Sequence, residues 1–283
     1  MSDGPVDPLF CSVALAQRIE RAEAELITAG TQPSIDRDPR RGFVLPVAGG
    51  FACFAEDGAP FNKVVGLGFG GVPSDPALDE VEAAYRVRGA LVQVELANLA
   101  DPEIGTLLTS RGYRLVGFEN VLGRLVSTGD VSIAPGEVEV RVSRDDELDA
   151  WVDIVTTGFA TPDEEGVATH EDFPREIIER AERDMISAGA RGYLALRDGT
   201  IAGGAGLRIA DGVAQLVGAA TAPEHRRRGV QTALLGARLD DAAKAGCDIA
   251  VVTTAPGSKS QQNVQRQGFH LLYTRAVLVR NVG

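Results

Sequence analysis

The sequence predicts a mixed α/β fold, in which helices pack on a sheet that contains both antiparallel and parallel strands. Two Asp-Gly turns join three consecutive apolar strands over 192–217, which is the pattern of an antiparallel meander. A helical pattern over 230–242 and the continuously apolar run Ile249–Val252 follow the meander. A right-handed crossover through that helix places Ile249–Val252 parallel to the last meander strand.

The same succession of elements occurs twice in the chain, at an offset of 156 residues. Three pairs of segments align in this register: 75–88 with 231–244, 91–96 with 247–252, and 111–115 with 267–271. The stretch 127–136 between the two copies is rich in turn-forming residues and poor in apolar ones. We therefore predict two units, 1–130 and 131–283, although any two mixed domains share some of this alternation.

The remaining elements follow from helical and alternating patterns. An apolar stripe predicts a helix from Ser12 to Ala29 in the first unit. In the second unit, Val138–Val142 alternates like a strand, and Ser143 with Asp146 three residues later is typical of a helix N-terminus. Two amphipathic helices follow, separated by a polar loop over 161–171, and they carry these apolar residues: Leu148, Trp151, Val152, Val155 and Phe159, then Ile177, Ile178, Ala181 and Met185.

The composition excludes several classes of function. The net charge of −12 disfavours binding to nucleic acids or anionic membranes, because both need a broad positive surface. Three cysteines and three histidines are widely separated and form no zinc motif, so we expect no metal site. No apolar signal core and no run of about 18 apolar residues occurs. These features predict a cytoplasmic protein without membrane contacts.

A basic segment, Arg226–Gln231, stands between a predicted strand and a predicted helix. The first turn of a helix has unpaired backbone N–H groups and a partial positive charge. Gly229 allows a ligand to approach the backbone, and arginine side chains can bind phosphate oxygens in a forked geometry. The segment therefore predicts an anion cradle suited to a pyrophosphate, the alternative being a solvated basic loop.

The segment Gln215–Leu235 resembles the acetyl-CoA motif of the GNAT-type N-acetyltransferases. That motif is a strand, a Pro-acidic turn and Gln/Arg-x-x-Gly-x-Gly/Ala at the start of a helix. Arg226, Gly229 and Gln231 occupy these positions, although Gln231 stands where Gly or Ala is usual. The segment Ser260–Phe269 is similar to the family's next element, a short helix that carries an Asn near the cofactor and ends at Gly-Phe.

This resemblance covers about residues 138–280 and implies tandem GNAT-like acyl-CoA N-acyltransferase folds. The second unit would be the N-acetyltransferase domain, and the first a degenerate GNAT-like domain without a cofactor cradle. In this family the sheet parts between the last meander strand and the next parallel strand, and the pantetheine arm of the cofactor enters the gap. The cofactor-binding residues that the resemblance implies are Ala220, Thr221, Ala222, Arg226, Arg227, Arg228, Gly229, Val230, Gln231, Thr232 and Asn263.

The activity that the resemblance implies is transfer of an acetyl group from acetyl-CoA to a primary amine of a small molecule or peptide, by direct attack. The departing thiolate then needs a proton. The family's usual donor is a tyrosine four residues before the Gly of Gly-Phe, where this chain has Val264. Tyr273 is our candidate general acid, the other interpretation being a strand residue with a solvated hydroxyl. For the general base we make no choice among loop carboxylates: Glu164, Glu165, Glu171 and Asp172.

Two other functions stay open. The missing tyrosine at position 264 motivates a non-catalytic acyl-CoA-binding or sensor module. The segment Gly66–Gly71 satisfies GxGxxG, which suggests an NAD-binding protein, but Pro73–Pro76 separates its last glycine from the following helix. In the repeat register Gly70–Asp75 aligns with Arg226–Gln231, so the first unit has no arginine there. We expect that unit to pack against the second, to shape the substrate cleft or to form a homodimer.

Overall fold

The computed structural model describes residues 9–127, 138–160, 167 and 173–283. The first half contains α1 (Val13–Arg37), β1 (Phe43–Val47), β2 (Gly50–Phe54), β3 (Lys63–Val65), α2 (Asp75–Arg86), β4 (Val92–Ala97), α3 (Pro102–Ser110) and β5 (Arg114–Leu125). The second half contains β6 (Glu139–Val142), η1 (Asp145–Glu147), α4 (Leu148–Ala160), α5 (Arg175–Ser187), β7 (Arg191–Arg197), β8 (Thr200–Ala210), β9 (Val213–Thr221), η2 (Pro223–His225), α6 (Val230–Lys244), β10 (Ile249–Thr254), α7 (Lys259–Gln265) and β11 (His270–Arg280).

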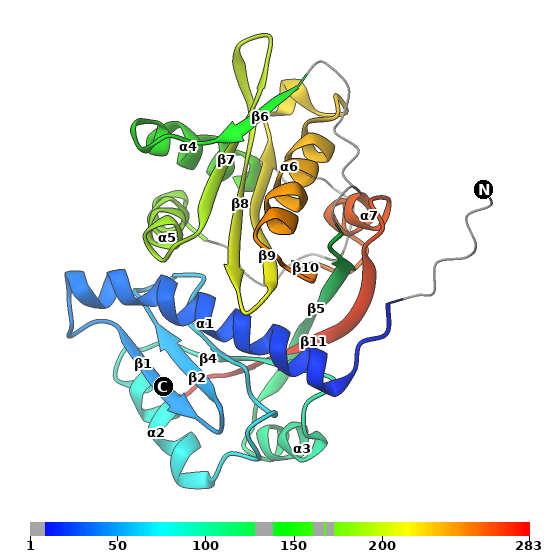
Figure 1. The fold of residues 1–283 in the computed structure, drawn as a ribbon. Coiled ribbons are helices and arrows are strands. Elements are labelled where there is room, and N and C mark those ends of the chain that lie inside the picture. The colour runs from blue at the N-terminus through cyan, green and yellow to red at the C-terminus, as the bar shows by residue number, and fades with distance from the viewer. Residues whose placement is uncertain (1–8, 128–137, 161–166, 168–172) are drawn as a thin grey trace.

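All of these strands lie in a single sheet, in the order β1-β2-β3-β4-β11-β5-β10-β9-β8-β7-β6. The pairs β3–β4 and β9–β10 are parallel, and the other neighbours are antiparallel. The predicted mixed α/β fold is therefore confirmed, including the three-strand meander β7-β8-β9 and the parallel strand β10. Figure 1 shows the sheet running through both halves of the molecule.

The two halves exchange their last strands. β11, from the second half, lies between β4 and β5 of the first half, and β5 pairs in turn with β10 of the second half. At the offset of 156 residues, α2 corresponds to α6, β4 to β10, α3 to α7 and β5 to β11. Each half thus ends in a strand that completes the sheet of the other. The division at residue 130 falls outside the described residues and stays a prediction.

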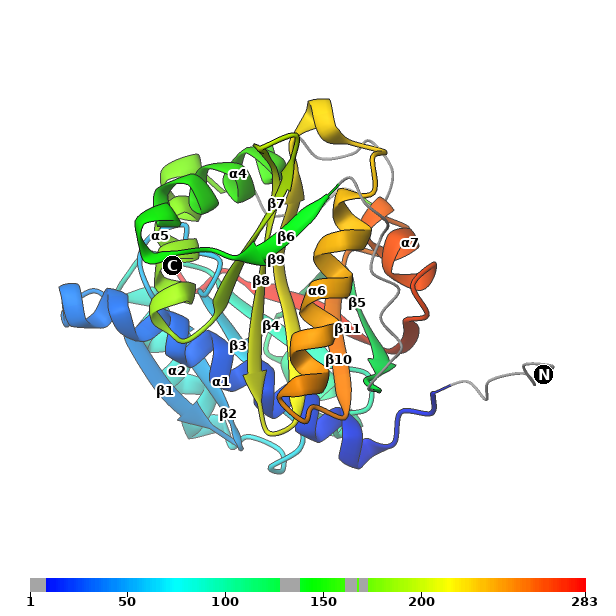
Figure 2. The same cartoon turned by 45° about the horizontal axis from the view of Figure 1, so that its top comes forward.

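The helices cover both faces of the second-half sheet. A Cβ atom on Gly203 of β8 would contact Val230 and Leu234 of α6, whereas one on Gly204 would contact Ile154 and Val155 of α4. Because successive residues of a strand point to opposite faces, α6 and α4 lie on opposite sides of the sheet. Figure 2 shows the same arrangement, with α5 beside α4.

Helix α1 connects the two halves. It packs on β1, β2 and β3 of the first half and on α5 and β9 of the second. It continues to Arg37, eight residues beyond the predicted end. Its last turns are buried although they are polar: the Thr31 hydroxyl donates to Ile27 O (2.8 Å) and the Ser34 hydroxyl to Ala55 O (2.9 Å). Within the described residues, no helix has the length and apolar character needed to cross a lipid bilayer.

Candidate active site

Strands β9 and β10 part soon after they meet. They pair in parallel at only three positions, Val213 with Ile249, Ala214 with Ala250, and Gln215 with Val251. Beyond these, β9 runs on to Thr221 and β10 to Thr254 without pairing to each other. The backbone N–H and C=O groups on the facing edges of the two strands are therefore available to a ligand that enters the gap.

A β-bulge at Gly218 lies in the part of β9 that borders this gap. Gly206 of β8 pairs with Val217, but Gly204, two residues before it, pairs with Ala220, so β9 has one extra residue. Gly218 has a φ of +50°, a conformation that glycine adopts more easily than other residues. Because a bulge bends its strand, this one helps to separate β9 from β10.

The start of α6 is open to an anion. Gly229 is its N-cap, with a φ of +79° and no side-chain cap. The first intrahelical hydrogen bond runs from Ala233 N–H to Gly229 O (2.9 Å), so the N–H groups of 230–232 have no partner within the helix. A Cβ atom on Gly229 would meet no atom within 4 Å. The cradle predicted from the sequence therefore has the space and the donors to fit a pyrophosphate.

A cavity of about 2100 Å³ joins this helix start to the gap. The predicted cofactor residues that line it are Ala220, Thr221, Arg226, Arg227, Gly229, Val230, Gln231, Thr232 and Asn263. Ala222 and Arg228 do not line it. The Ala222 N–H donates to Ala202 O (3.0 Å), so it is already paired within the sheet, and Arg228 is exposed on the loop.

The side chain of Gln231, in the first turn of α6, is directed toward the end of β9. Its amide donates to the hydroxyl of Thr221 (3.1 Å), at the end of β9. Glycine or alanine at this position keeps the helix start accessible in the GNAT motif that the sequence resembles. Here the longer side chain of Gln231 lines the cavity and is held against β9 by this hydrogen bond.

Tyr273, the candidate general acid, lies in β11 and is 3% exposed. Its hydroxyl donates to Oε1 of Glu20 on α1 (2.6 Å), and burial raises its pKa well above the usual value. It is not among the residues that line the cavity. These contacts favour a structural role for Tyr273 as a strand residue, although its hydroxyl is buried against Glu20 and is not solvated as the alternative interpretation expected. The four loop carboxylates considered as general bases, Glu164, Glu165, Glu171 and Asp172, lie outside the described residues.

The opposite end of the cavity, beyond the gap, has mostly apolar walls. They come from α1, the segment before β3, and α5: Ile19, Leu26, Ile27, Pro60, Phe61, Ile178, Ala181 and Met185. Two carboxylates, Glu23 and Glu182, line the same space. Glu23 accepts from Gln215 Nε2 (3.3 Å) and lies 3.7 Å from Arg275 Nη1.

Glu182, on α5, is a residue that the sequence reasoning missed. A Cβ atom on Gly218 would lie 3.1 Å from its Oε2, so the carboxylate rests against the β-bulge. Burial raises the pKa of Glu182 to about 7. In the sequence Glu182 lies one helical turn from both Ile178 and Met185, but nothing local indicates that this helix face borders a cavity.

Buried charges form the wall between the two halves. Arg275 of β11 is 1% exposed and its Nε donates to Glu20 (2.7 Å), while Lys63 of β3 pairs with Glu95 of β4. Burial and the nearby carboxylate of Glu95 raise the pKa of Glu119 to about 7. Arg275 reaches this position only because β11 lies in the first half of the sheet.

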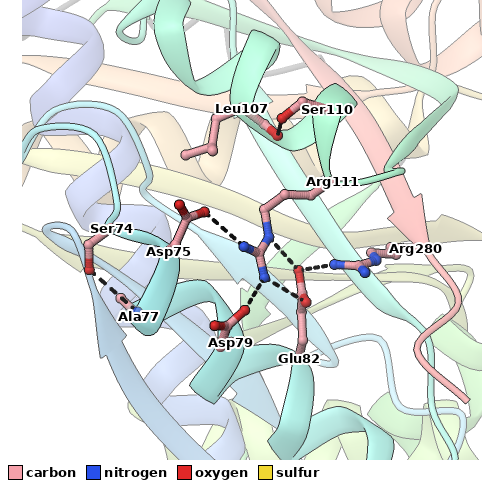
Figure 3. Close-up of polar contacts among 9 residues, drawn as sticks. All are labelled: Ser74, Asp75, Ala77, Asp79, Glu82, Leu107, Ser110, Arg111 and Arg280. Atoms are coloured by element: carbon pink, nitrogen blue, oxygen red, sulfur yellow. Dashed lines mark hydrogen bonds and ion pairs between the residues drawn. The ribbon is translucent and has the colours of Figure 1, made fainter.

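The corresponding helix start in the first half is closed (Figure 3). The hydroxyl of Ser74 caps α2 by accepting from Ala77 N–H (3.4 Å), and Asp75 occupies the first helical position. Arg111 pairs with Asp75 (2.9 Å), and also with Asp79 and Glu82. A phosphate placed here would meet acidic side chains instead of free donors, which is the physical basis for expecting no cofactor in this half.

The glycines of 66–71 are explained by close packing. Gly68 O accepts from Asp101 N–H (3.1 Å), and a Cβ atom on Gly68 would lie 2.3 Å from Ala100 Cβ. A Cβ atom on Gly70 would lie 2.7 Å from Gly49 Cα. The segment thus rests against the end of β4 and the β1–β2 turn. Because α2 begins only at Asp75, these glycines do not present a helix start to a dinucleotide.

Comparison with known proteins tests the fold that the resemblance implies. A family model described as "Acetyltransferase (GNAT) family" matches residues 152–269. No curated protein matches this chain. A GCN5-related N-acetyltransferase from Kribbella flavida has a similar structure, with a TM-score of 0.67 and 20% identity over 95% of this chain and 96% of that one.

Two further solved structures share the fold at lower similarity. A GCN5-related N-acetyltransferase from Sphaerobacter thermophilus has a TM-score of 0.54 and 16% identity, over 73% of this chain and 67% of that one. A tandem GNAT protein from the clavulanic acid biosynthesis pathway has a TM-score of 0.54 and 13% identity, over 74% and 69%. Together with the family match, these likenesses establish the GNAT-type fold predicted from the resemblance, and residues 152–269 are similar to the GNAT family of acetyltransferases.

Proposed function

We propose that the protein transfers the acetyl group of acetyl-CoA to a primary amine, by direct attack of the amine on the thioester. The match of residues 152–269 to the GNAT family model supports acyltransferase activity in general. The observation that carries the finer proposal is the parting of β9 and β10 beside the uncapped start of α6. The diphosphate of acetyl-CoA suits the unpaired N–H groups at the start of α6. The amide-containing arm attached to it suits the unpaired strand edges in the adjoining gap.

Each part of the cavity has a role in this proposal. The N–H groups of 230–232 and the side chains of Arg226 and Arg227 bind the diphosphate. The unpaired edge of β9 after Gln215 binds the amides of the arm, and Asn263 offers one further hydrogen bond. N–H donors on this edge polarise the thioester carbonyl and stabilise negative charge on its oxygen as the amine attacks.

The acceptor is a small molecule or a peptide amine, and we propose a cytoplasmic location for the reaction. Cys11, Cys53 and Cys247 are free thiols, as expected for a protein in a reducing compartment. The net charge of −12 makes nucleic acid and anionic membranes unfavourable partners. The first half shapes the acceptor end of the cavity through α1 and β3, and formation of a homodimer stays open.

Calorimetry with acetyl-CoA and NAD, followed by CoA-release assays on a panel of amines, tests the proposal. We expect acetyl-CoA to bind, NAD not to bind, and CoA to be released with at least one amine. Binding of NAD without binding of acetyl-CoA contradicts the proposal. Tight binding of acetyl-CoA with no turnover on any amine supports the alternative, a non-catalytic acyl-CoA-binding or sensor module.

A further inference from the structure

The closed end of the gap fixes where the reacting atoms lie, if the proposed function holds. The extended arm begins at the start of α6 near Gly229 and runs along β9 toward Gln215, the last residue of β9 that pairs with β10. The arm cannot pass that point, because the two strands are hydrogen-bonded there. Its thioester end must therefore lie beside the last unpaired residues of β9, which include the bulge at Gly218.

Glu182 approaches that point from the α5 side of the sheet. Its carboxylate is close enough to the bulge that a Cβ atom on Gly218 would lie 3.1 Å from Oε2 and 3.4 Å from Oε1. Glu23, the other carboxylate of the acceptor end, is held by Gln215 and Arg275. Within the described part of the chain, Glu182 has no comparable hydrogen bond or ion pair.

The charged groups around Glu182 do not neutralise it. Those that line the cavity from neighbouring elements are Glu23 of α1, Lys63 of β3, Arg175 of α5, Arg226, Arg238 of α6 and Arg275 of β11. Among the described contacts, none of them is within ion-pair distance of the Glu182 carboxylate, and removal from water is what raises its pKa to about 7.

Among the described residues, the remaining walls of the acceptor end are mostly apolar. On the α1, β3 and α5 walls, Lys63 pairs with Glu95, Arg175 pairs with Asp153 and Glu179, and Glu23 lies near Arg275, while the other side chains apart from Glu182 are apolar. A ligand that fills this space must be largely apolar, since a second charge would lose its water without gaining a free partner.

We propose that this end of the cavity takes a primary amine carried on an apolar body, and that Glu182 is the base that removes its proton. The amine arrives as an ammonium ion, and one proton passes from nitrogen to the Glu182 carboxylate. The freed nitrogen lone pair forms the C–N bond to the thioester carbon, and the C–S bond then breaks. The second nitrogen proton goes to the sulfur, giving the amide and the free thiol, and Glu182 returns its proton to water.

The apolar walls also help the proton transfer. Desolvation disfavours both the carboxylate and the ammonium, so it raises the pKa of Glu182 and lowers that of the bound amine. The two values move toward each other, which is the condition for efficient general-base catalysis near neutral pH. We expect kcat/KM to fall about tenfold per pH unit below about 7, where Glu182 becomes protonated.

Hexylamine and 1,6-diaminohexane are matched probes for the apolar body, because they have the same length and differ in one charge. We expect kcat/KM for hexylamine to exceed that for the diamine by at least about tenfold. Equal rates, or a preference for the diamine, overturn the proposed acceptor class. Failure of both amines to react with a protein that binds acetyl-CoA overturns the inference, whereas failure to bind acetyl-CoA overturns the proposed function itself.

The variant Glu182→Gln tests the base. With hexylamine, we expect turnover to slow by about 10²-fold or more, the acidic limb of the pH profile to disappear, and the acetyl-CoA affinity to stay unchanged. Glu176→Gln, an exposed acid on the same helix, is the matched control. Glu119→Gln removes the other carboxylate with a pKa of about 7, and the limb should persist in it. If the acidic limb of the pH–rate profile persists in Glu182→Gln, or disappears in Glu119→Gln, a group other than Glu182 produces that limb, and the proposal is overturned.

Discussion

Arg275, on the last strand, donates its guanidinium Nε to Glu20, on the first helix, over 2.7 Å, and the two side chains are 1% and 2% exposed. The same carboxylate oxygen accepts from Tyr273. This contact joins α1 to β11, the strand of the second half that lies in the first half of the sheet. It also stands at the wall of the cavity, so the stability of the fold and the shape of the acceptor end depend on one buried ion pair.

Breaking this pair should be costly. We expect Arg275→Met to lower the free energy of unfolding by about 3–5 kcal/mol, because Glu20 and its neighbouring carboxylates would lose their buried cation. Urea denaturation measures the change. The double variant Glu20→Gln/Arg275→Met should recover part of the loss, since it leaves fewer unpaired charges. Equal stability of the single variant and the wild type would contradict the ion pair's role.

The anion cradle can be tested with two matched glycines. Gly229→Glu places a carboxylate against the proposed diphosphate site and should weaken acetyl-CoA binding by about 100-fold or more, as measured by calorimetry. Gly246 has nearly the same backbone angle, a φ of +77° against +79°, and a Cβ atom there meets nothing within 4 Å. Gly246→Glu should therefore cause a similar backbone strain and leave the affinity unchanged. Equal loss of affinity in both variants would point to strain instead of charge.

Tyr273→Phe separates the two interpretations of this tyrosine. Because the hydroxyl donates to a buried carboxylate, its removal should lower the free energy of unfolding by about 1–3 kcal/mol. We expect the turnover rate to change by less than about tenfold, since the hydroxyl is engaged outside the cavity. Stopped-flow measurements of CoA release at several pH values check the second part. If a fully folded variant instead turned over about 100-fold more slowly, Tyr273 would be restored as the acid.

The exchanged strands predict that neither half folds alone. A fragment of 138–283 lacks β5, so β10 loses its antiparallel neighbour and β11 loses both β4 and β5. We expect this fragment to show no cooperative thermal transition by circular dichroism and no acetyl-CoA binding. Mixing it with a fragment of 1–127 should restore both. A fragment that folds and binds by itself would mean that the halves can also close separately.

The sequence was sufficient for the parts of this protein that depend on local chemistry. The Asp-Gly turns, the apolar strand Ile249–Val252 and the start of α6 at Gly229 are determined by backbone conformation and short-range patterning, and they appear as predicted. The end of α1 was missed because its buried face carries the polar residues Thr31 and Ser34. Their hydroxyls are satisfied by backbone carbonyls, so no apolar stripe marks the helix there.

The exchange of β5 and β11 could not be predicted from the sequence. The two strands occupy equivalent places in the repeat, so each has a pattern that suits either partner strand. Only the three-dimensional pairing decides between them. Glu182 was missed for a related reason: its neighbours on α5 predict a helix face in the core, and nothing local indicates that this face borders a cavity.

The exchange also determines when the molecule can become native. Ala97 of β4 pairs with Arg275, so the first-half sheet stays open on one side until residues 270–280 have left the ribosome. The nascent protein must keep that edge from pairing with other chains during synthesis. Pairing between residues this far apart in the sequence is slow, so we expect insertion of β11 between β4 and β5 to be the late step that completes both halves.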